Sequence, residues 1–449
     1  MVKSNDSLTD GVIWKRMIIF ALPILLGNLF QQLYNTVDTL IVGNYLGSSA
    51  LAAVSSSGSL IFMLIGFLTG IASGAGVIIS RFYGAKDIKN LQIAIHTTVA
   101  FGLIAGIIMT FVGVYFSPNI LRLMGTPVGV IRESIIYLQI YFSGSLGFVM
   151  YNVFVGIFQA VGDSKHPLYY LIISSIVNLV LDIVFIKFFH MGVGGAGLAT
   201  VISQGISSIL CLIQLLKSKM EYRLRINKIK INNNILSLII KIGLPSGIQN
   251  SIIAFANVLV QSSVNSFGEL AMAGYGAYSK VEGFGFLPIN SFSMAITTFV
   301  GQNLGSKQYE RAKTGVKFGV WMAVILAEII GVIVFIFAPQ MIKAFDPSPE
   351  VIKFGVEKAR TAALFYCVLA YSNSIAAVLR GAGKAIVSMF VMILFWCIIR
   401  VAFLAITIPL TNNIIMVYAV YPITWSLSSI FLFIYYRKSN WMFNHKKLN

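Results

Sequence analysis

The sequence is poor in charged residues and in the residue types that bind metals or catalyse reactions. Only 11% of its 449 residues are charged, and acidic residues number 15. Its three cysteines, Cys211, Cys367 and Cys397, lie in separate apolar runs, too far apart in sequence to form a metal pair or redox motif. The four histidines form no ligand cluster, and neither His-Glu-x-x-His nor Gly-x-Ser-x-Gly is present. We therefore expect no cofactor and no enzymatic activity.

What the sequence has instead is hydrophobic length. Hydrophobic residues make up 57% of the chain, and apolar runs of about 20 residues or more, enough to span a bilayer, recur throughout. In lipid such runs must be helical, because unpaired backbone groups find no water there. We predict an all-α polytopic membrane protein with twelve transmembrane helices, at roughly 13–43, 50–80, 90–116, 134–161, 165–188, 192–216, 236–266, 272–302, 312–341, 355–380, 385–409 and 412–437.

The net charge of +18 invites a nucleic-acid interpretation, but the basic residues are in the wrong places for one. Most of them fall in alternate short connections between apolar runs, which is the positive-inside pattern that sets membrane orientation. We expect a multi-pass protein of the cytoplasmic membrane, with both termini in the cytoplasm and no nucleic-acid partner. The polar N-terminus and the long first run argue against a cleaved signal peptide.

The two halves of the chain repeat at a shift of about 221 residues. Leu46-Gly-Ser-Ser-Ala-Leu-Ala52 aligns with Phe267-Gly-Glu-Leu-Ala-Met-Ala273, and Gly84-Ala-Lys86 aligns with Gly305-Ser-Lys307. A basic connection separates the halves, so we expect a six-helix bundle over 1–216, a cytoplasmic linker over 217–235 and a second six-helix bundle over 236–449. An even number of spans in each half makes the repeats parallel, with the substrate site between them near the membrane midplane.

The first span carries a polar stripe at membrane depth. Gln31, Asn35 and Asp38 share one helical face, with Tyr34 beside them. A charged carboxylate at a helix centre costs about 2.5–3.5 kcal/mol on insertion scales, so Asp38 is a functional candidate by default. The alternative is an interhelical hydrogen bond that only fixes packing.

A second polar stripe follows in the fifth and sixth spans. Asn178 and Asp182 are one helical turn apart, as are Thr200 and Gln204. Asp38 and Asp182 together would suit a proton or a sodium ion, with the amide and hydroxyl oxygens completing a Na+ shell, and two such carboxyls titrate as a coupled pair. The alternative is a polar cluster that pins two helices together.

The second half has no matching acids, because the shift maps Asp38 near Leu259 and Asp182 onto Phe403. We therefore expect ion coupling in the first bundle, while the second bundle shapes the substrate cavity. Glu282 would meet a cationic substrate or pair with a basic group, and Arg400 is more consistent with a counter-ion than with a substrate contact. The cavity residues we predict are Gln31, Tyr34, Asn35, Asn152, Gln204, Asn257, Gln261, Glu282, Phe286 and Asn290.

Four motifs carry a family resemblance over essentially the whole chain. They are Val37-Asp38 with Gly43 and Leu46-Gly47, then Asn178-Leu-Val-Leu-Asp182, then Gly194-Gly-Ala-Gly-Leu-Ala-Thr-Val-Ile-Ser-Gln204, and Phe299-Val-Gly-Gln-Asn-Leu-Gly305. With them the chain resembles the multidrug and toxic compound extrusion (MATE) transporters, and the spacing of Asp38, Asn178, Asp182 and Thr200 is similar to the cation site of their DinF-like branch. It departs from the NorM-like branch, which has an acidic residue in the seventh span.

The resemblance implies two pseudo-symmetric six-helix bundles arranged as a V, and efflux of organic compounds driven by inward H+ or Na+. It implies that Asp38, Asn178, Asp182 and Thr200 line the cavity of the first bundle, and that Pro23 lets the first helix bend when the site is protonated. From the residues alone, Pro23 is either a hinge or a fixed kink.

We therefore predict a secondary-active antiporter that exports small organic compounds by alternating access, and we expect these compounds to be cationic and amphipathic. We expect a monomer in the lipid bilayer, with H+ or Na+ as the coupling ion. The main rival is a flippase for lipid-linked precursors, which would favour a strongly basic cavity. A passive channel is a further rival, and it would show no uphill transport.

Overall fold

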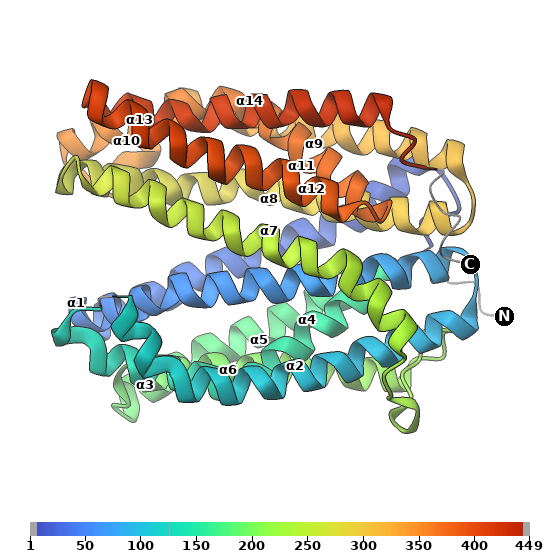
Figure 1. Cartoon of the computed structure of the whole chain (residues 1–449). Coiled ribbons are helices and arrows are strands. Elements are labelled where there is room, and N and C mark those ends of the chain that lie inside the picture. Colours follow the sequence, from blue (N-terminus) through green and yellow to red (C-terminus); the bar gives the residue numbers. More distant parts are fainter. Residues whose placement is uncertain (1–6, 125, 443–449) are drawn as a thin grey trace. The chain divides into compact units, whose positions relative to one another are not determined.

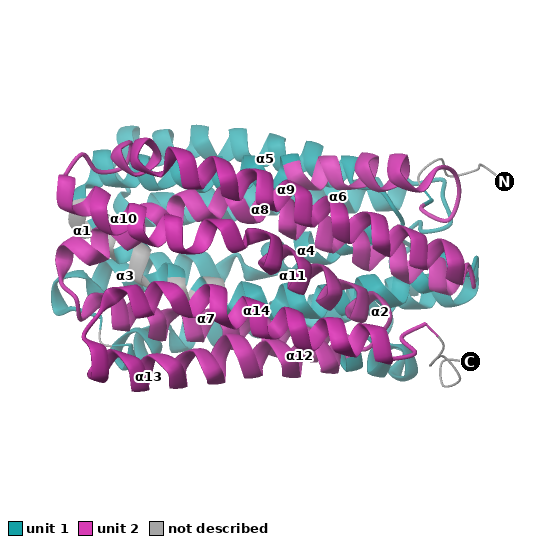
Figure 2. Cartoon of the chain, turned by 90° about the horizontal axis from the view of Figure 1, so that it is seen from above, with its two compact units in different colours: residues 1–7, 26–241 teal, residues 8–25, 242–449 magenta. Residues whose placement is uncertain are grey.

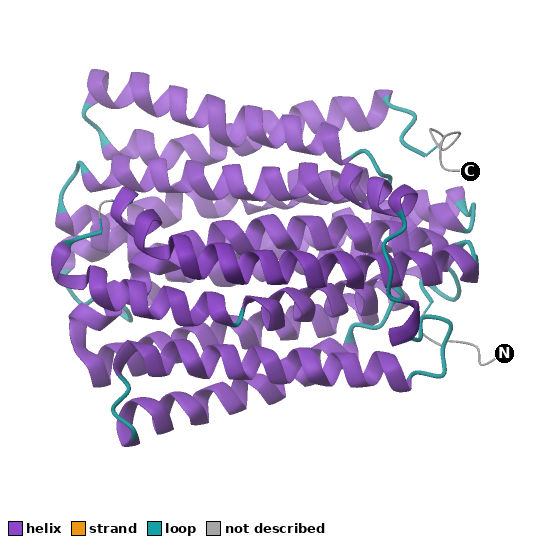
Figure 3. Ribbon diagram, turned by 60° about the horizontal axis from the view of Figure 1, so that its bottom comes forward, coloured by secondary structure: helices purple, strands orange, loops and turns teal. Residues whose placement is uncertain are grey.

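The computed structural model describes residues 7–124 and 126–442, and every regular element in these ranges is helical. The apolar composition explains this, because a helix satisfies all its backbone groups within one segment. Figure 1 shows long helices that run in nearly parallel or antiparallel directions, and Figure 3 shows short loops joining them at their ends. The all-α prediction is confirmed for the described part of the chain.

The chain forms two compact units, coloured separately in Figure 2. Unit 1 contains residues 1–7 and 26–241, and unit 2 contains residues 8–25 and 242–449. The first helix is therefore divided, because residues 8–25 pack with the C-terminal half of the chain. The basic connection at 217–235 packs with unit 1. The three segments expected from the sequence, 1–216, 217–235 and 236–449, therefore remain a prediction. The compact units divide the chain at residues 7, 25 and 241 instead.

Unit 1 is built from the main part of α1 and the four spans that follow it, with α3 and α4 counted as one. Its elements are α1 (Ile13–Gly84), α2 (Ile88–Leu123), α3 (Val128–Ser143), α4 (Ser145–Ala160), α5 (Lys165–Ile183), the π-helix η1 (Val184–Phe188), α6 (Gly192–Lys217) and the 3-10 turn η2 (Ile226–Lys228). Helix α2 packs on α3 and α4, while α6 packs on α3, α4 and α5. Helix α6 thus lies against three neighbours in unit 1.

Unit 2 repeats this plan, with α14 in the place of α6. Besides residues 8–25, its elements are α7 (Asn233–Asn265) from residue 242 onward, α8 (Glu269–Gly305), α9 (Tyr309–Lys343), α10 (Pro349–Ala362), the 3-10 turn η3 (Ala363–Phe365), α11 (Tyr366–Gly381), α12 (Ala385–Ile393), the π-helix η4 (Leu394–Ile399), α13 (Arg400–Thr411) and α14 (Ile414–Lys438). Helix α8 packs on α9, α10 and α11, and α14 packs on α10, α11 and α13.

The described helices contain 11 segments long and apolar enough to cross a membrane, or 12 when the bent pair α3 and α4 is taken as one span. The first two spans meet inside α1 at a kink, where Gly47 takes a left-handed φ of 83°, and this kink falls between the predicted spans 13–43 and 50–80. One span differs from the prediction. The fourth span is bent by 50° between Val128–Ser143 and Ser145–Ala160.

The internal repeat is visible in the backbone. Residues with positive φ recur in pairs 221 positions apart: Gly47 (83°) with Gly268 (97°), Lys86 (56°) with Lys307 (58°), and Gly162 (92°) with Gly383 (77°). Left-handed conformations are uncommon for non-glycine residues, so the lysine pair is informative. The two halves therefore share turn geometry as well as hydrophobic pattern.

Candidate carboxylate site in unit 1

Two carboxyl groups from distant parts of the sequence meet inside unit 1. Asp38 comes from α1 and Asp182 from the last turn of α5, and their side chains lie within hydrogen-bonding distance of each other. Asp182 is 0% exposed, and Asp38 is half-buried. Oδ1 of each carboxyl is buried, and no hydrogen-bond donor among the described residues reaches it.

The other two predicted coupling residues join the same cluster. The amide of Asn178, oriented so that donors meet acceptors, donates from Nδ2 to Asp182 Oδ2 at 2.8 Å and accepts from the backbone N–H of Thr200 at 3.2 Å. The hydroxyl of Thr200 donates to the carbonyl of Ala196 at 3.0 Å, and Tyr34 lies close to it. The structure therefore brings Asp38, Asn178, Asp182 and Thr200 together, with Tyr34 beside them.

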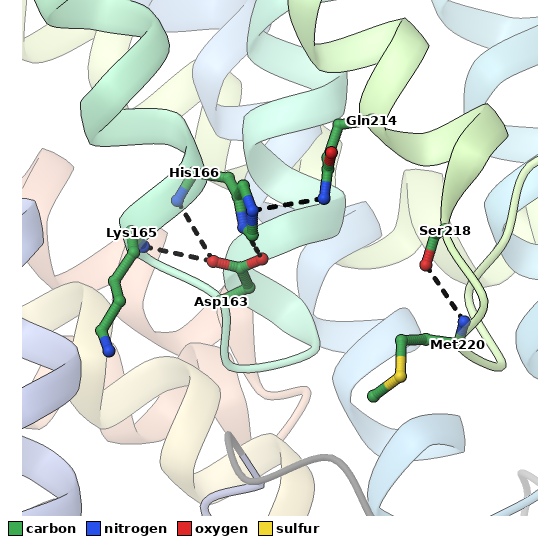
Figure 4. Close-up of polar contacts among 6 residues, drawn as sticks. All are labelled: Asp163, Lys165, His166, Gln214, Ser218 and Met220. Atoms are coloured by element: carbon green, nitrogen blue, oxygen red, sulfur yellow. Dashed lines mark hydrogen bonds and ion pairs between the residues drawn. The ribbon is translucent and has the colours of Figure 1, made fainter. Parts of the chain in front are cut away.

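Asn178 and Asp182 are positioned by their spacing along α5 and by a cap at the start of this helix. Residues 178 and 182 fall on one helical face, and Ser174 on the same stripe is also buried. At the other end of α5, Asp163 accepts from the backbone N–H groups of Lys165 and His166 at 3.2 Å each, which caps the helix. Figure 4 shows this cap and the side chains of His166 and Gln214, which meet at 3.2 Å.

Two carboxyl groups that face each other share a proton favourably, because two adjacent negative charges repel and an isolated charge is expensive in such surroundings. The amide of Asn178 and the hydroxyls of Thr200 and Tyr34 add further polar groups around the pair of Asp38 and Asp182. This arrangement can bind and release an ion of single positive charge.

The remaining predicted cavity residues of unit 1 are more scattered. Gln31 and Asn35 are exposed on α1, and Gln204 is half-buried on α6 with Oε1 unpartnered. Asn152 donates to the carbonyl of Phe148 at 2.9 Å on its own helix and lines a mostly apolar pocket with Thr98 and Phe101. None of these contacts joins them to the carboxyl pair.

In unit 2 the structure separates the predicted residues into two groups. Asn257 accepts from Arg400 at 3.3 Å, and Glu282 accepts from Tyr278 at 3.3 Å. Gln261, in contrast, donates to Asn265 on its own helix, and Asn290 is exposed. Phe286 stacks on Tyr366 at a centroid distance of 6.4 Å.

Arg400 also shows where the sequence analysis was incomplete. Its side chain donates hydrogen bonds to two neutral groups among the described residues, Asn257 and Thr424. Lys358, which is fully buried near Glu282, was not predicted. The sequence pattern placed the tenth span at 355–380, so that Lys358 lay at the edge of the span, next to the polar connection. In the structure α10 begins at Pro349, and Lys358 lies well inside the helix.

A third feature that the sequence analysis missed holds the N-terminal segment to unit 2. The N–H of Leu8 donates to Gln302 Oε1 at 2.9 Å, and Arg311 donates to the carbonyls of Leu8, Asp10 and Gly11, the last at 2.7 Å. Gln302 belongs to the Phe299–Gly305 motif, so that motif has a structural task. This segment leads directly into the part of α1 that packs with unit 2.

Comparison with family models finds one match, and it occurs twice. The MatE family model matches residues 23–184 and again residues 245–406. The two matches together cover well over half of the chain, and their starts are 222 positions apart, in agreement with the backbone repeat.

Curated relatives align over nearly the full length. The chain is 30% identical over 443 residues to the probable multidrug resistance protein YpnP of Bacillus subtilis, covering 98% of each. It is 29% identical over 437 residues to the probable multidrug resistance protein YoeA of the same organism, covering 95% of this chain and 94% of YoeA. A probable multidrug resistance protein NorM of Thermotoga maritima is 27% identical, covering 84% and 82%.

Solved structures share the fold. A MOP superfamily transporter from Pyrococcus furiosus, described as having a binding pocket of reverse polarity, matches with a TM-score of 0.92 at 23% identity, covering 97% of this chain and 98% of that one. An outward-facing multidrug resistance MATE transporter matches with a TM-score of 0.91, also at 23% identity and with the same coverage. The predicted twelve-helix fold class is thereby confirmed.

Proposed function

Because the chain belongs to the MatE family of multi-pass membrane transporters, we propose that it is a secondary-active antiporter that exports organic compounds in exchange for protons. The names of its relatives, which are multidrug resistance proteins, support multidrug efflux. We further propose that it belongs to the DinF-like branch, acts as a monomer in the cytoplasmic membrane, keeps both termini in the cytoplasm and catalyses no reaction.

One observation carries the choice of the coupling site. The carboxyl groups of Asp38 and Asp182 face each other inside unit 1, where a shared proton removes the repulsion between two buried negative charges. When that proton leaves, two negative charges face each other in a poorly hydrated site, and the pair then attracts a cation. A proton and a cationic group therefore compete for the pair, and each one weakens the binding of the other.

This mutual exclusion is what an antiporter needs. A proton that weakens substrate binding must itself be bound more weakly when the substrate is present, because coupling free energies are reciprocal. Asn178 and Thr200 keep Asp182 in place throughout, and Tyr34 connects α1 to the same cluster. We propose that Pro23, which interrupts the backbone hydrogen bonds of α1 about four turns before Asp38, is the hinge that transmits the change.

The test is ethidium efflux from liposomes that contain the purified protein, with pH and sodium gradients imposed separately. Wild type is expected to expel ethidium under the pH gradient, and both Asp38→Asn and Asp182→Asn are expected to abolish the driven component. Asp346→Asn is the matched control, since it makes the same chemical change in a loop where Asn keeps the acceptor for Ser348 N–H. Driven efflux by both single variants at the wild-type rate would refute the proposal, and efflux driven by sodium alone would replace H+ with Na+.

The flippase for lipid-linked precursors stays as a second candidate because of one observation. Lys358 and Arg400 are both buried in unit 2, so its interior contains more basic charge than the sequence suggested. A flippase would move a fluorescent lipid-linked phosphate in the same liposomes without expelling ethidium. Ethidium efflux without that movement favours the antiporter.

A further inference from the structure

The ammonium group of Lys358 is enclosed by aromatic rings in unit 2. Lys358 is 0% exposed, and its Nζ lies 3.4 Å from the ring centroid of Tyr421. The rings of Tyr275, Tyr278 and Tyr418 are at 5.5, 5.7 and 5.8 Å. Cation–π attraction compensates part of the lost hydration of the ammonium group, but Nζ makes no hydrogen bond.

A second cation lies against the same ring. The guanidinium carbon of Arg400 is 4.5 Å from the ring centroid of Tyr421, and Arg400 is only 2% exposed. Its two terminal nitrogens donate to Asn257 at 3.3 Å and Thr424 at 3.1 Å, while Nε has no partner. Tyr421 is therefore in contact with two buried positive charges.

The charges in this cluster do not balance. Glu282 is the acid that interacts electrostatically with both Lys358 and Arg400. Glu357, the neighbouring acid, is half-buried and interacts with Tyr418. With all three groups ionised, one carboxylate faces two interior cations, and an unpaired charge in a dry interior is strongly destabilising, so this cluster favours a further negative charge.

Unsatisfied donors mark where an anion would be held. Three buried groups in this cluster have hydrogens to donate and no acceptor among the described residues: Lys358 Nζ, Arg400 Nε and the hydroxyl of Tyr418. Buried polar groups in native proteins nearly always have a partner, so three vacant donors beside an excess positive charge are unusual. An acceptor of single negative charge would satisfy the donors and the charge together.

We propose that Lys358 and Arg400, walled by Tyr275, Tyr278, Tyr418 and Tyr421, form a binding site for the carboxylate of an organic anion or zwitterion. A guanidinium and an ammonium suit a carboxylate, and the tyrosine rings suit an aromatic or apolar body attached to it. Asn257, which accepts from Arg400, is exposed. The site does not depend on the coupling pair in unit 1, and it extends the expected cargo beyond cations.

The test is equilibrium binding of radiolabelled benzoate to the purified full-length protein in detergent, without any gradient. Wild type is expected to bind benzoate saturably, and Lys358→Met is expected to weaken binding by about tenfold to a hundredfold, the range for loss of a charged hydrogen-bond partner. Lys353→Met is the matched control, because it removes the same charge from an exposed position of the same helix. It should bind like wild type.

A variant of opposite sign covers the case in which Lys358→Met fails to fold. Glu282→Gln raises the positive excess and should bind benzoate more tightly than wild type does. Chloride competition separates an organic carboxylate from a simple halide, and halide binding without benzoate binding would overturn the carboxylate assignment. Absence of saturable binding of either anion, or benzoate affinity unchanged in both variants, would overturn the site. Because no gradient is used, these results stand whether or not Asp38 and Asp182 couple protons.

Discussion

The proton pair leads to a quantitative prediction about stoichiometry. The proposed mechanism uses one proton, which Asp38 and Asp182 share, and Asn178 Nδ2 donates to Asp182 Oδ2 at 2.8 Å. Exchange of one proton for one monovalent cation moves no net charge. Each pH unit then supplies about 1.36 kcal/mol, which sustains a tenfold concentration ratio.

The assay is the steady distribution of tetraethylammonium across liposomes that contain the protein, with the membrane potential clamped by potassium and valinomycin. This hydrophilic quaternary ammonium ion has no titratable group and does not cross a bilayer unaided, so its distribution reports the coupling alone. We expect the ratio generated by the protein to rise about tenfold per pH unit and to be independent of the clamped potential. Asp38→Asn should remove the pH dependence, while Asp346→Asn should preserve it.

Exchange of two protons would give a different outcome. The ratio would then rise about a hundredfold per pH unit, and it would change about fiftyfold per 100 mV, because one net charge would cross at about 2.3 kcal/mol. A ratio of that size with steep voltage dependence would refute the one-proton account of the pair.

Three further predictions concern packing and the first helix. Gly315→Ala would place a Cβ 2.0 Å from a ring carbon of Phe299, so it should destabilise the protein by about 1–3 kcal/mol in thermal unfolding, whereas Gly276→Ala, with nothing within 4 Å, should not. Arg311→Met should speed hydrogen exchange in the N-terminal segment without changing exchange in α5, because it removes that segment's bonds to the guanidinium; unchanged exchange would contradict the anchoring role. Pro23→Ala should leave proton binding intact and slow ethidium efflux at least severalfold, and a wild-type rate would show that Pro23 is only a kink.

Most of the fold was predictable because hydrophobic length and the repeat are local, additive signals. Apolar runs located the spans, and the repeat at 221 reappears in the conformations of Lys86 and Lys307. The break inside the fourth span was not predictable, because it depends on backbone geometry at Gly144 rather than on hydrophobicity.

The candidate site was predictable only in part. The stacking of Asn178 and Asp182 follows from helical spacing, but their meeting with Asp38 joins positions 144 apart, and only the family resemblance suggested it. The surroundings of Lys358 were missed because a lysine near a span boundary is normally assigned to the solvated connection. Its burial depends on tertiary packing of α8, α10 and α14, which single-segment patterns do not contain.

Proton release on substrate binding tests the central claim most directly. Purified protein in weakly buffered detergent solution is mixed with tetraphenylphosphonium, and the pH change is measured per protein molecule. The account predicts release of about one proton by wild type and none by Asp38→Asn or Asp182→Asn, since substrate and proton exclude each other at the pair. Binding of tetraphenylphosphonium by wild type without proton release would contradict it.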